Sequence, residues 1–151
     1  MTDPGPGPEL TYTRVFAAPR ELVFRCLTEP EHLTHFWGPV GTRTPPEAIT
    51  VDLRPGGVFE TVMVSESDGS RYTMHAVFDE VAAPERLVWT EPASGVTTIS
   101  TFKELSGPRT EVRIVQRNVP EAFRRPEAQA GFRTSLDRLA SYLTQQTGAT
   151  R

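Results

Sequence analysis

The longest stretch with a single hydrophobic period covers residues 126–146. Apolar side chains recur there at steps of four, three and four residues, as Phe132, Leu136, Leu139 and Leu143. This spacing places all four on one face of an α-helix, and Pro126 suits its first position. Such a helix cannot bury a continuous apolar stripe by itself, so the chain before it must supply the surface on which it packs.

The chain before this helix changes its period twice. Residues 10–17 alternate as a strand does, and two short helical segments follow at 19–28 and 31–37. From residue 48 onward the period is two, which predicts strands at 48–53, 58–64, 71–81, 86–91, 95–105 and 109–117. The order predicts an α+β fold in which a curved antiparallel sheet wraps around the C-terminal helix.

The ends of the chain differ from its middle in composition. Residues 10–146 are predicted to form one domain, long enough to bury a hydrophobic core. Residues 1–9 are rich in Pro and Gly and are predicted to be a disordered tail. Residues 147–151 are expected to form a second, shorter tail.

Composition narrows the class of partner and the compartment. The formal net charge is −3 with both signs dispersed, which argues against a nucleic-acid partner. The single cysteine, Cys26, excludes an internal disulfide and fits a reducing compartment. The chain shows no signal-peptide pattern and no apolar run of membrane length. We therefore expect a cytoplasmic protein that does not associate with membranes.

Two histidines raise the question of a metal site. His32 and His35 are three residues apart and could share a helix face beside Glu31. A zinc site, however, needs three or four ligands of compatible geometry, and the chain contains no cysteine pair. We expect no metal and no cofactor, and we interpret these histidines as exposed residues of a short helix.

Catalytic motifs are also missing from the sequence. No phosphate-binding loop, dinucleotide-binding fingerprint or catalytic-triad order occurs. Alternation places Asp52, Glu60 and Glu111 opposite the apolar positions of their strands, where they face solvent. His75 could form an acid–base pair with Glu60 or with Thr61, although nothing in the spacing requires it. The sequence therefore does not indicate an enzyme.

Four stretches resemble one known family in order and spacing. They are RVFAAPRELVFRCLTEPEHLTHFWGP at 14–39, ITVDLRPGGVFETVM at 49–63, APERLVWT at 83–90 and GFRTSLDRLASYL at 131–143. The chain resembles the activator of heat-shock-protein-90 ATPase homologue family, within the START-like or SRPBCC superfamily. The resemblance implies a helix-grip fold with a cavity between the sheet and the C-terminal helix. The activity of most bacterial members of this family is unknown.

The chain departs from the usual pattern of this family on one strand. Thr98 and Ser100 stand where apolar β-branched residues are more usual, and Gly131-Phe132 replaces a frequent Gly-Trp pair. If Phe102 faces inward, alternation turns Thr98 and Ser100 inward as well. Interior hydroxyls are normally hydrogen-bonded or hydrated, so they indicate a ligand site. Two alternatives stay open: these side chains bond to backbone or water, or the assigned facing is wrong by one residue.

The candidate ligand site combines apolar walls with a few polar positions. The resemblance also places Trp37 near the cavity mouth, where it could act as a lid. The complete candidate set is Trp37, Phe59, Thr61, Met63, His75, Trp89, Thr98, Ser100, Phe102, Gln116 and Phe132.

Three function classes follow from the pattern and the resemblance. The first, and the one that the candidate site favours, is binding of a small apolar or amphipathic molecule. The second, implied only by the resemblance, is a co-chaperone-like module that contacts heat-shock protein 90. The third is a cyclase- or dehydratase-like enzyme of the kind that the superfamily includes. A homodimer remains an open alternative for the assembly.

Overall fold

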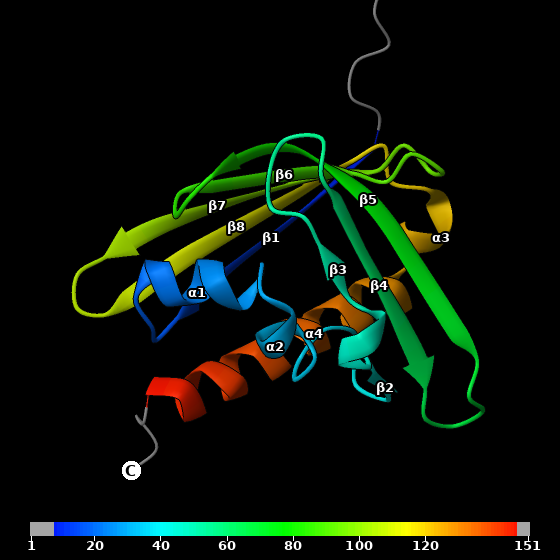
Figure 1. Ribbon diagram of the computed structural model, residues 1–151, viewed down its shortest axis with the longest axis horizontal. Coiled ribbons are helices and arrows are strands. Elements are labelled where there is room, and N and C mark those ends of the chain that lie inside the picture. Colours follow the sequence, from blue (N-terminus) through cyan, green and yellow to red (C-terminus); the bar gives the residue numbers. More distant parts are fainter. Residues whose placement is uncertain (1–7, 148–151) are drawn as a thin grey trace, which may run out of the picture.

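A computed structural model describes residues 8–147 as one curved sheet with helices on its concave side (Figure 1). The strands are β1 (Glu9–Phe16), β2 (Thr42–Arg43), β3 (Thr50–Val51), β4 (Val58–Ser65), β5 (Arg71–Ala82), β6 (Arg86–Thr90), β7 (Thr97–Leu105) and β8 (Arg109–Arg117). The helices are α1 (Arg20–Cys26), α2 (Pro30–Leu33), the 3₁₀ turn η1 (Pro46–Ala48), α3 (Glu121–Arg124) and α4 (Pro126–Thr147).

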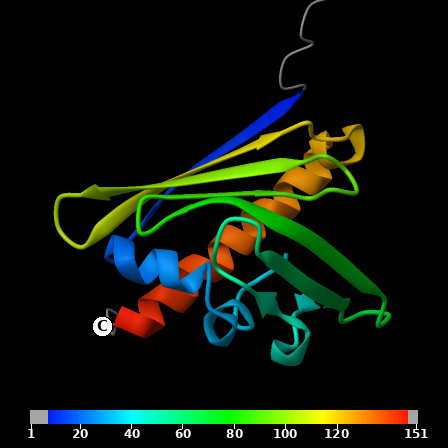
Figure 2. The same cartoon turned by 45° about the horizontal axis from the view of Figure 1, so that its top comes forward.

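The sheet is antiparallel and contains eight strands in the order β1-β8-β7-β6-β5-β4-β2, with β3 also paired to β4. The first strand therefore joins the last, and the intervening strands form a meander. In Figure 2 the same strands cross above α4, while α1 and α2 lie beside that helix. The predicted α+β helix-grip fold is confirmed.

Some boundaries differ from the prediction, mostly where elements are short. The first strand begins at Glu9, which the sequence assigned to the disordered tail; its carboxylate pairs with Arg117 at 3.1 Å. The second helix ends at Leu33 and continues only as turns to Phe36. The strand expected at 48–53 is reduced to β3, and β2 and α3 were not predicted. Thr147, which the sequence assigned to the C-terminal tail, is the last residue of α4, and Pro8 precedes β1 as a bend. The other residues of the expected tails, 1–7 and 148–151, lie outside the described residues.

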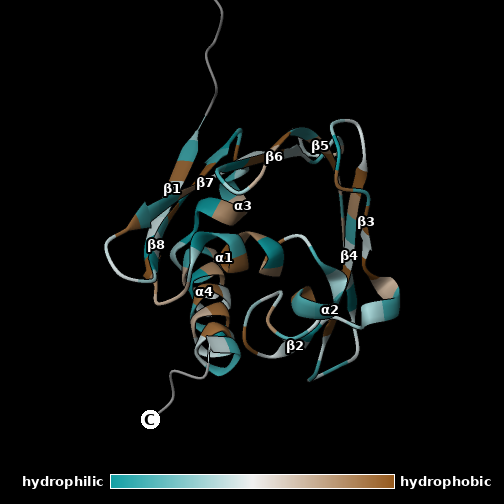
Figure 3. Ribbon diagram, turned by 60° about the vertical axis from the view of Figure 1, so that its left-hand side comes forward, coloured by the Kyte–Doolittle hydropathy of each residue, from teal (hydrophilic) through white to brown (hydrophobic). Residues whose placement is uncertain are grey.

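The core forms where the sheet bends over the helices (Figure 3). On α4 the buried side chains are Leu136, Leu139, Tyr142 and Leu143, so the predicted stripe faces inward and includes a tyrosine. Its remaining member, Phe132, lies half-buried near the start of α4, where its ring is 4.3 Å from that of Tyr12 on β1. Arg14 of β1 forms an ion pair with Asp137 of α4 at 2.5 Å. Within residues 8–147, no helix has the length and apolarity needed to cross a membrane.

Cys26 provides a test of burial in the core. Its side chain is fully enclosed, and burial raises the pKa of the Cys26 thiol to about 12. The thiolate is the reactive form, so the folded protein should not react with Ellman's reagent at mildly alkaline pH over minutes. Unfolding in guanidinium should release one equivalent of the coloured product at once. Fast reaction of the native protein would contradict this packing.

Candidate functional site

The inner face of β7 and β8 carries the polar positions of the candidate site. Thr98, Ser100 and Phe102 all point into the interior, with exposed fractions of 2–3%. Thr98 lies directly opposite Gln116 on β8, and Gln116 is only half-buried. Directly opposed residues of an antiparallel pair have Cβ atoms about 4.5–5.5 Å apart, so these side chains form one polar patch.

The hydroxyls of this patch differ from the other interior hydroxyls in their bonding. Thr61 on β4 accepts a hydrogen bond from the indole Nε1 of Trp37 at 3.0 Å. Thr110 on β8 donates to the carbonyl of Ala18 at 2.8 Å. Within residues 8–147, by contrast, no side-chain hydrogen bond joins the hydroxyl of Thr98 or Ser100 to another residue, yet neither oxygen is among the fully enclosed atoms without a partner. Both hydroxyls therefore keep some accessible surface, on which they can bond to a water or a ligand.

An aromatic cluster borders the polar patch on one side. Phe59 on β4 stacks on Phe78 of β5 at 5.4 Å, and Trp89 of β6 meets Phe59 edge-on at 4.9 Å. Trp37 closes the cluster, 5.4 Å from Phe59 and 6.4 Å from Trp89. The hydrogen bond to Thr61 holds the indole of Trp37 in this position. Trp37, which the family resemblance suggested as a lid, is therefore packed inward.

Two further members of the candidate set lie on the inner side of the sheet, away from the Thr98–Gln116 pair. Met63 on β4 packs under the loop that follows α2, because a Cβ added to Gly38 would lie 2.8 Å from its sulfur. Phe102 on β7 meets Phe24 of α1 edge-on at 5.4 Å. Both side chains are part of the apolar surroundings, and neither is next to the Thr98–Gln116 pair.

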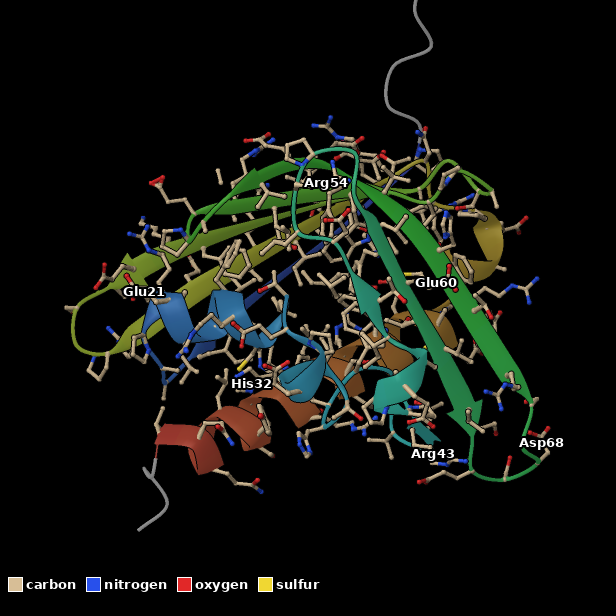
Figure 4. The ribbon with its side chains drawn as sticks, in the orientation of Figure 1. Glu21, His32, Arg43, Arg54, Glu60 and Asp68 are labelled. Atoms are coloured by element: carbon tan, nitrogen blue, oxygen red, sulfur yellow. The ribbon has the colours of Figure 1, made fainter. Side chains whose placement is uncertain are left out.

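His75 does not belong to the interior, and its assignment to the ligand set is wrong. It pairs in register with Glu60 of β4, and the neighbours of Glu60 on that strand, Phe59 and Thr61, are the residues that face inward. The imidazole Nδ1 lies 2.8 Å from the Glu60 carboxylate, with the two side chains 49% and 39% exposed. Glu60 is labelled on β4 in Figure 4. The proposed acid–base pair with Glu60 therefore exists as a surface contact, remote from the polar patch.

A carboxyl group that the sequence pattern did not single out lies at the end of β6. Glu91 follows Thr90, and its backbone N–H donates to the carbonyl of Val96, which continues the ladder by one residue pair. Trp89 and Val96 are both buried on the inner face, so alternation turns the Glu91 side chain to that face as well. Glu91 is half-buried and, within residues 8–147, forms no ion pair. Burial raises the pKa of its carboxyl group above the ordinary value.

A hollow lies outside the sheet, against the second half of α4. It has a volume of about 420 Å³ and is lined by His35, Val40, Asp137, Arg138, Ser141, Tyr142 and Gln145. His35 stacks on Tyr142 at 5.2 Å, and His32, between α2 and α4 in Figure 4, hydrogen-bonds to the Tyr142 hydroxyl. His35 is exposed, as the sequence predicted, whereas His32 is half-buried against α4, which the sequence did not predict.

The polar groups of this hollow are largely engaged with the protein itself. The Nη1 of Arg138 donates to the carbonyls of Gly38, Pro39 and Thr42, which fixes the loop after α2 to α4. Over residues 8–147, no three His, Cys, Asp or Glu side chains come together in a way that could hold a metal ion. We interpret this hollow as the outer edge of the contact between α4 and the loop that follows α2.

Comparison with known proteins gives a family for the chain. Protein NE0264 from Nitrosomonas europaea is similar in structure, with a TM-score of 0.80, 28% identity, and coverage of 93% of this chain and 96% of that one. Protein CV1439 from Chromobacterium violaceum is similar with a TM-score of 0.79, 26% identity, and coverage of 90% and 97%. No curated protein matches.

A third structure shows the same fold at lower identity. It is an AHSA1-like protein from Aeromonas hydrophila, with a TM-score of 0.78, 22% identity, and coverage of 93% of this chain and 94% of that one. The family model described as "Activator of Hsp90 ATPase homolog 1-like protein" matches residues 17–144, most of the chain. The chain therefore belongs to the family of activator of Hsp90 ATPase homolog 1-like proteins, with its START-like (SRPBCC) fold.

Proposed function

We propose that the protein binds a small, partly apolar molecule between the inner face of the sheet and the first half of α4. The observation that carries this proposal is the pair of inward-facing hydroxyls, on Thr98 and Ser100, that bond to no other described side chain and are not fully enclosed. A core with no ligand would favour valine or alanine at these positions, because apolar side chains pack there without a polar group to satisfy. A ligand oxygen or nitrogen on this face of the sheet could bond to both hydroxyls.

The surroundings of the patch support an apolar body for such a ligand. Leu10 and Tyr12 of β1 lie opposite Gln116 and Ile114 of β8, and Phe132 of α4 packs over the Tyr12 ring. On the other side, Trp89 lies opposite Thr98. Small-molecule sites typically combine mostly apolar walls with a few convergent polar groups, and this end of the interior has that composition.

The side chains that face the polar patch are sufficient for ligand binding, whereas acid–base catalysis would need more titratable groups among them. Acid–base catalysis commonly uses two titratable groups whose environments push their pKa values apart. Among the described residues that face the polar patch, Glu91 is the one carboxyl group, and His75 lies on the opposite face. The chaperone role suggested by the family description would act through the outer surface and would not require unpaired interior hydroxyls.

Thr98→Val tests the proposal because it preserves the shape of the side chain and removes the hydroxyl. We expect the variant to be as stable as the parent or more stable, since a methyl group replaces a polar group in a largely apolar interior. Its affinity for ligands that hydrogen-bond at this position should fall by about 1 kcal/mol, or roughly fivefold in Kd. The ligands are found by a thermal-shift screen of small amphipathic molecules, and their Kd values are then measured by calorimetry.

Thr101→Val is the matched control, because Thr101 lies on the outer face of the same strand, opposite Arg113. It should leave every Kd unchanged. If the screen yields hits that bind parent, Thr98→Val and Thr101→Val equally, the polar patch is not the ligand site.

A further inference from the structure

We propose that the ligand carries a protonated amine and that this amine pairs with Glu91. This inference rests on the proposed function and specifies its ligand class. Glu91 lies diagonally across the β6–β7 ladder from Thr98, because Trp89 is the residue directly opposite Thr98 and Val96 is opposite Glu91. Such diagonal neighbours are about 7–8 Å apart, a distance that one ammonium group can bridge.

Charge balance in the interior favours a cationic ligand. Arg14 of β1 and Asp137 of α4 already neutralise each other as a solvent-exposed ion pair, so Arg14 supplies no countercharge to Glu91. Glu91 has no such partner among residues 8–147, and burial is the one cause that shifts its pKa, with no contribution from a neighbouring cation. A half-buried carboxylate without a countercharge loses part of its hydration, and an ammonium group beside it would offset that loss.

The neighbouring polar side chains suit an ammonium group better than a metal ion. An ammonium group has three N–H donors and no acceptor, so it needs several oxygen acceptors within reach. Three neighbouring strands provide such acceptors on the inner face. They are the Glu91 carboxylate at the end of β6, the Thr98 hydroxyl on β7 and the Gln116 amide oxygen on β8. A metal ion would need a denser set of ligands, and in the described part of the chain no three metal-ligating side chains come together.

The experiment compares matched probes that differ only in their polar group. Phenylethyl, phenylbutyl and phenylhexyl amines, alcohols and carboxylates are titrated into the full-length protein at neutral pH by calorimetry. The best amine should bind at least about tenfold more tightly than the alcohol with the same carbon skeleton, because a charge-assisted pair replaces a neutral hydrogen bond. The carboxylates should bind more weakly than the alcohols, since they would face Glu91 with a like charge.

Glu91→Gln then tests the named residue. It should reduce the advantage of the amine over the alcohol to about twofold or less, while the affinity for the alcohol stays unchanged. Glu111→Gln is the control, because Glu111 of β8 lies on the outer face next to inward-facing Thr110 and Val112. It should leave the preference for the amine intact.

The outcomes separate this inference from the function on which it rests. Equal affinity of the parent for amine and alcohol, or an amine preference that survives Glu91→Gln, would overturn the amine assignment and leave ligand binding in place. If no probe of any class binds, both proposals are contradicted. The three-class comparison on the parent remains decisive even if Glu91→Gln does not fold.

Discussion

Replacing Leu139 with alanine should lower the free energy of unfolding by about 2–5 kcal/mol, the range observed for large-to-small changes in well-packed cores. Leu139 lies in the middle of the buried stripe of α4 and is only 2% exposed. The long helix is held to the sheet by few other interactions, of which the Arg14–Asp137 ion pair is exposed to solvent and therefore weak. Urea denaturation should show a lower midpoint with an unchanged slope.

Gln146→Ala is the matched control on the same helix, because Gln146 is exposed near its end. It should change stability by less than about 0.5 kcal/mol. A Leu139→Ala variant as stable as this control would mean that α4 is a peripheral helix and does not fill the concave face of the sheet.

Gly57→Ala should destabilise the protein by about 3 kcal/mol or more, because the new Cβ has no space. Built on the present backbone, that atom would lie 2.0 Å from the carbonyl oxygen of Asp52. Neither segment can move easily: the Asp52 oxygen accepts from the N–H of Arg54 at 2.8 Å, and the Gly57 oxygen accepts from Phe78 at 2.9 Å. Thermal and denaturant unfolding would both report the loss.

Gly56→Ala separates this steric effect from a loss of backbone freedom. Gly56 has a φ of +84° and open space where a Cβ would project. Alanine there should cost about 1–2 kcal/mol, the ordinary penalty for a left-handed backbone conformation. Equal losses at positions 56 and 57 would show that the turn relaxes and that the close approach to Asp52 is not a constraint.

Hydrophobic periodicity predicted the fold because the long elements carry their pattern locally. The period of two along β4, β7 and β8 and the four-residue stripe of α4 needed no tertiary information. The two-residue strands β2 and β3 were missed or overextended because segments of this length have no readable period. Helix α2 was predicted too long: Thr34 to Phe36 form turns, and the following Trp37 packs against Phe59, a contact that is not local in sequence.

The candidate site could be predicted only in part. The face of the sheet to which a side chain points follows from the local sequence, whereas its hydrogen-bond partner depends on distant segments. Alternation from Phe102 placed Thr98 and Ser100 inward, and both are buried. The bond between Trp37 and Thr61 joins segments 24 residues apart, so the sequence did not reveal that this hydroxyl already has a partner. His75 was assigned to the wrong face, although the buried Ala76 and Phe78 on the same strand follow an alternation that excludes it.

Glu91 illustrates a limit of a different kind. Continuing the alternation from Trp89 by two residues would have placed its carboxyl group on the inner face, so the direction was readable. The burial of Glu91 could not be read from the sequence, because its backbone pairing with Val96 and the turn between them form only when β6 and β7 are assembled. The loss of hydration that raises the pKa of Glu91 is a property of the folded sheet.

Chemical-shift mapping with phenylbutylamine tests the central claim of interior binding most directly. In a titration of the ¹⁵N-labelled protein, the account predicts saturable shifts at Glu91, Thr98, Ser100 and Gln116 and at Phe132 on the facing helix. Ser141 and Gln145, which line the outer hollow, should stay unchanged. Shifts confined to Ser141, Gln145 and their neighbours, with none on the inner face of β7 and β8, would contradict it.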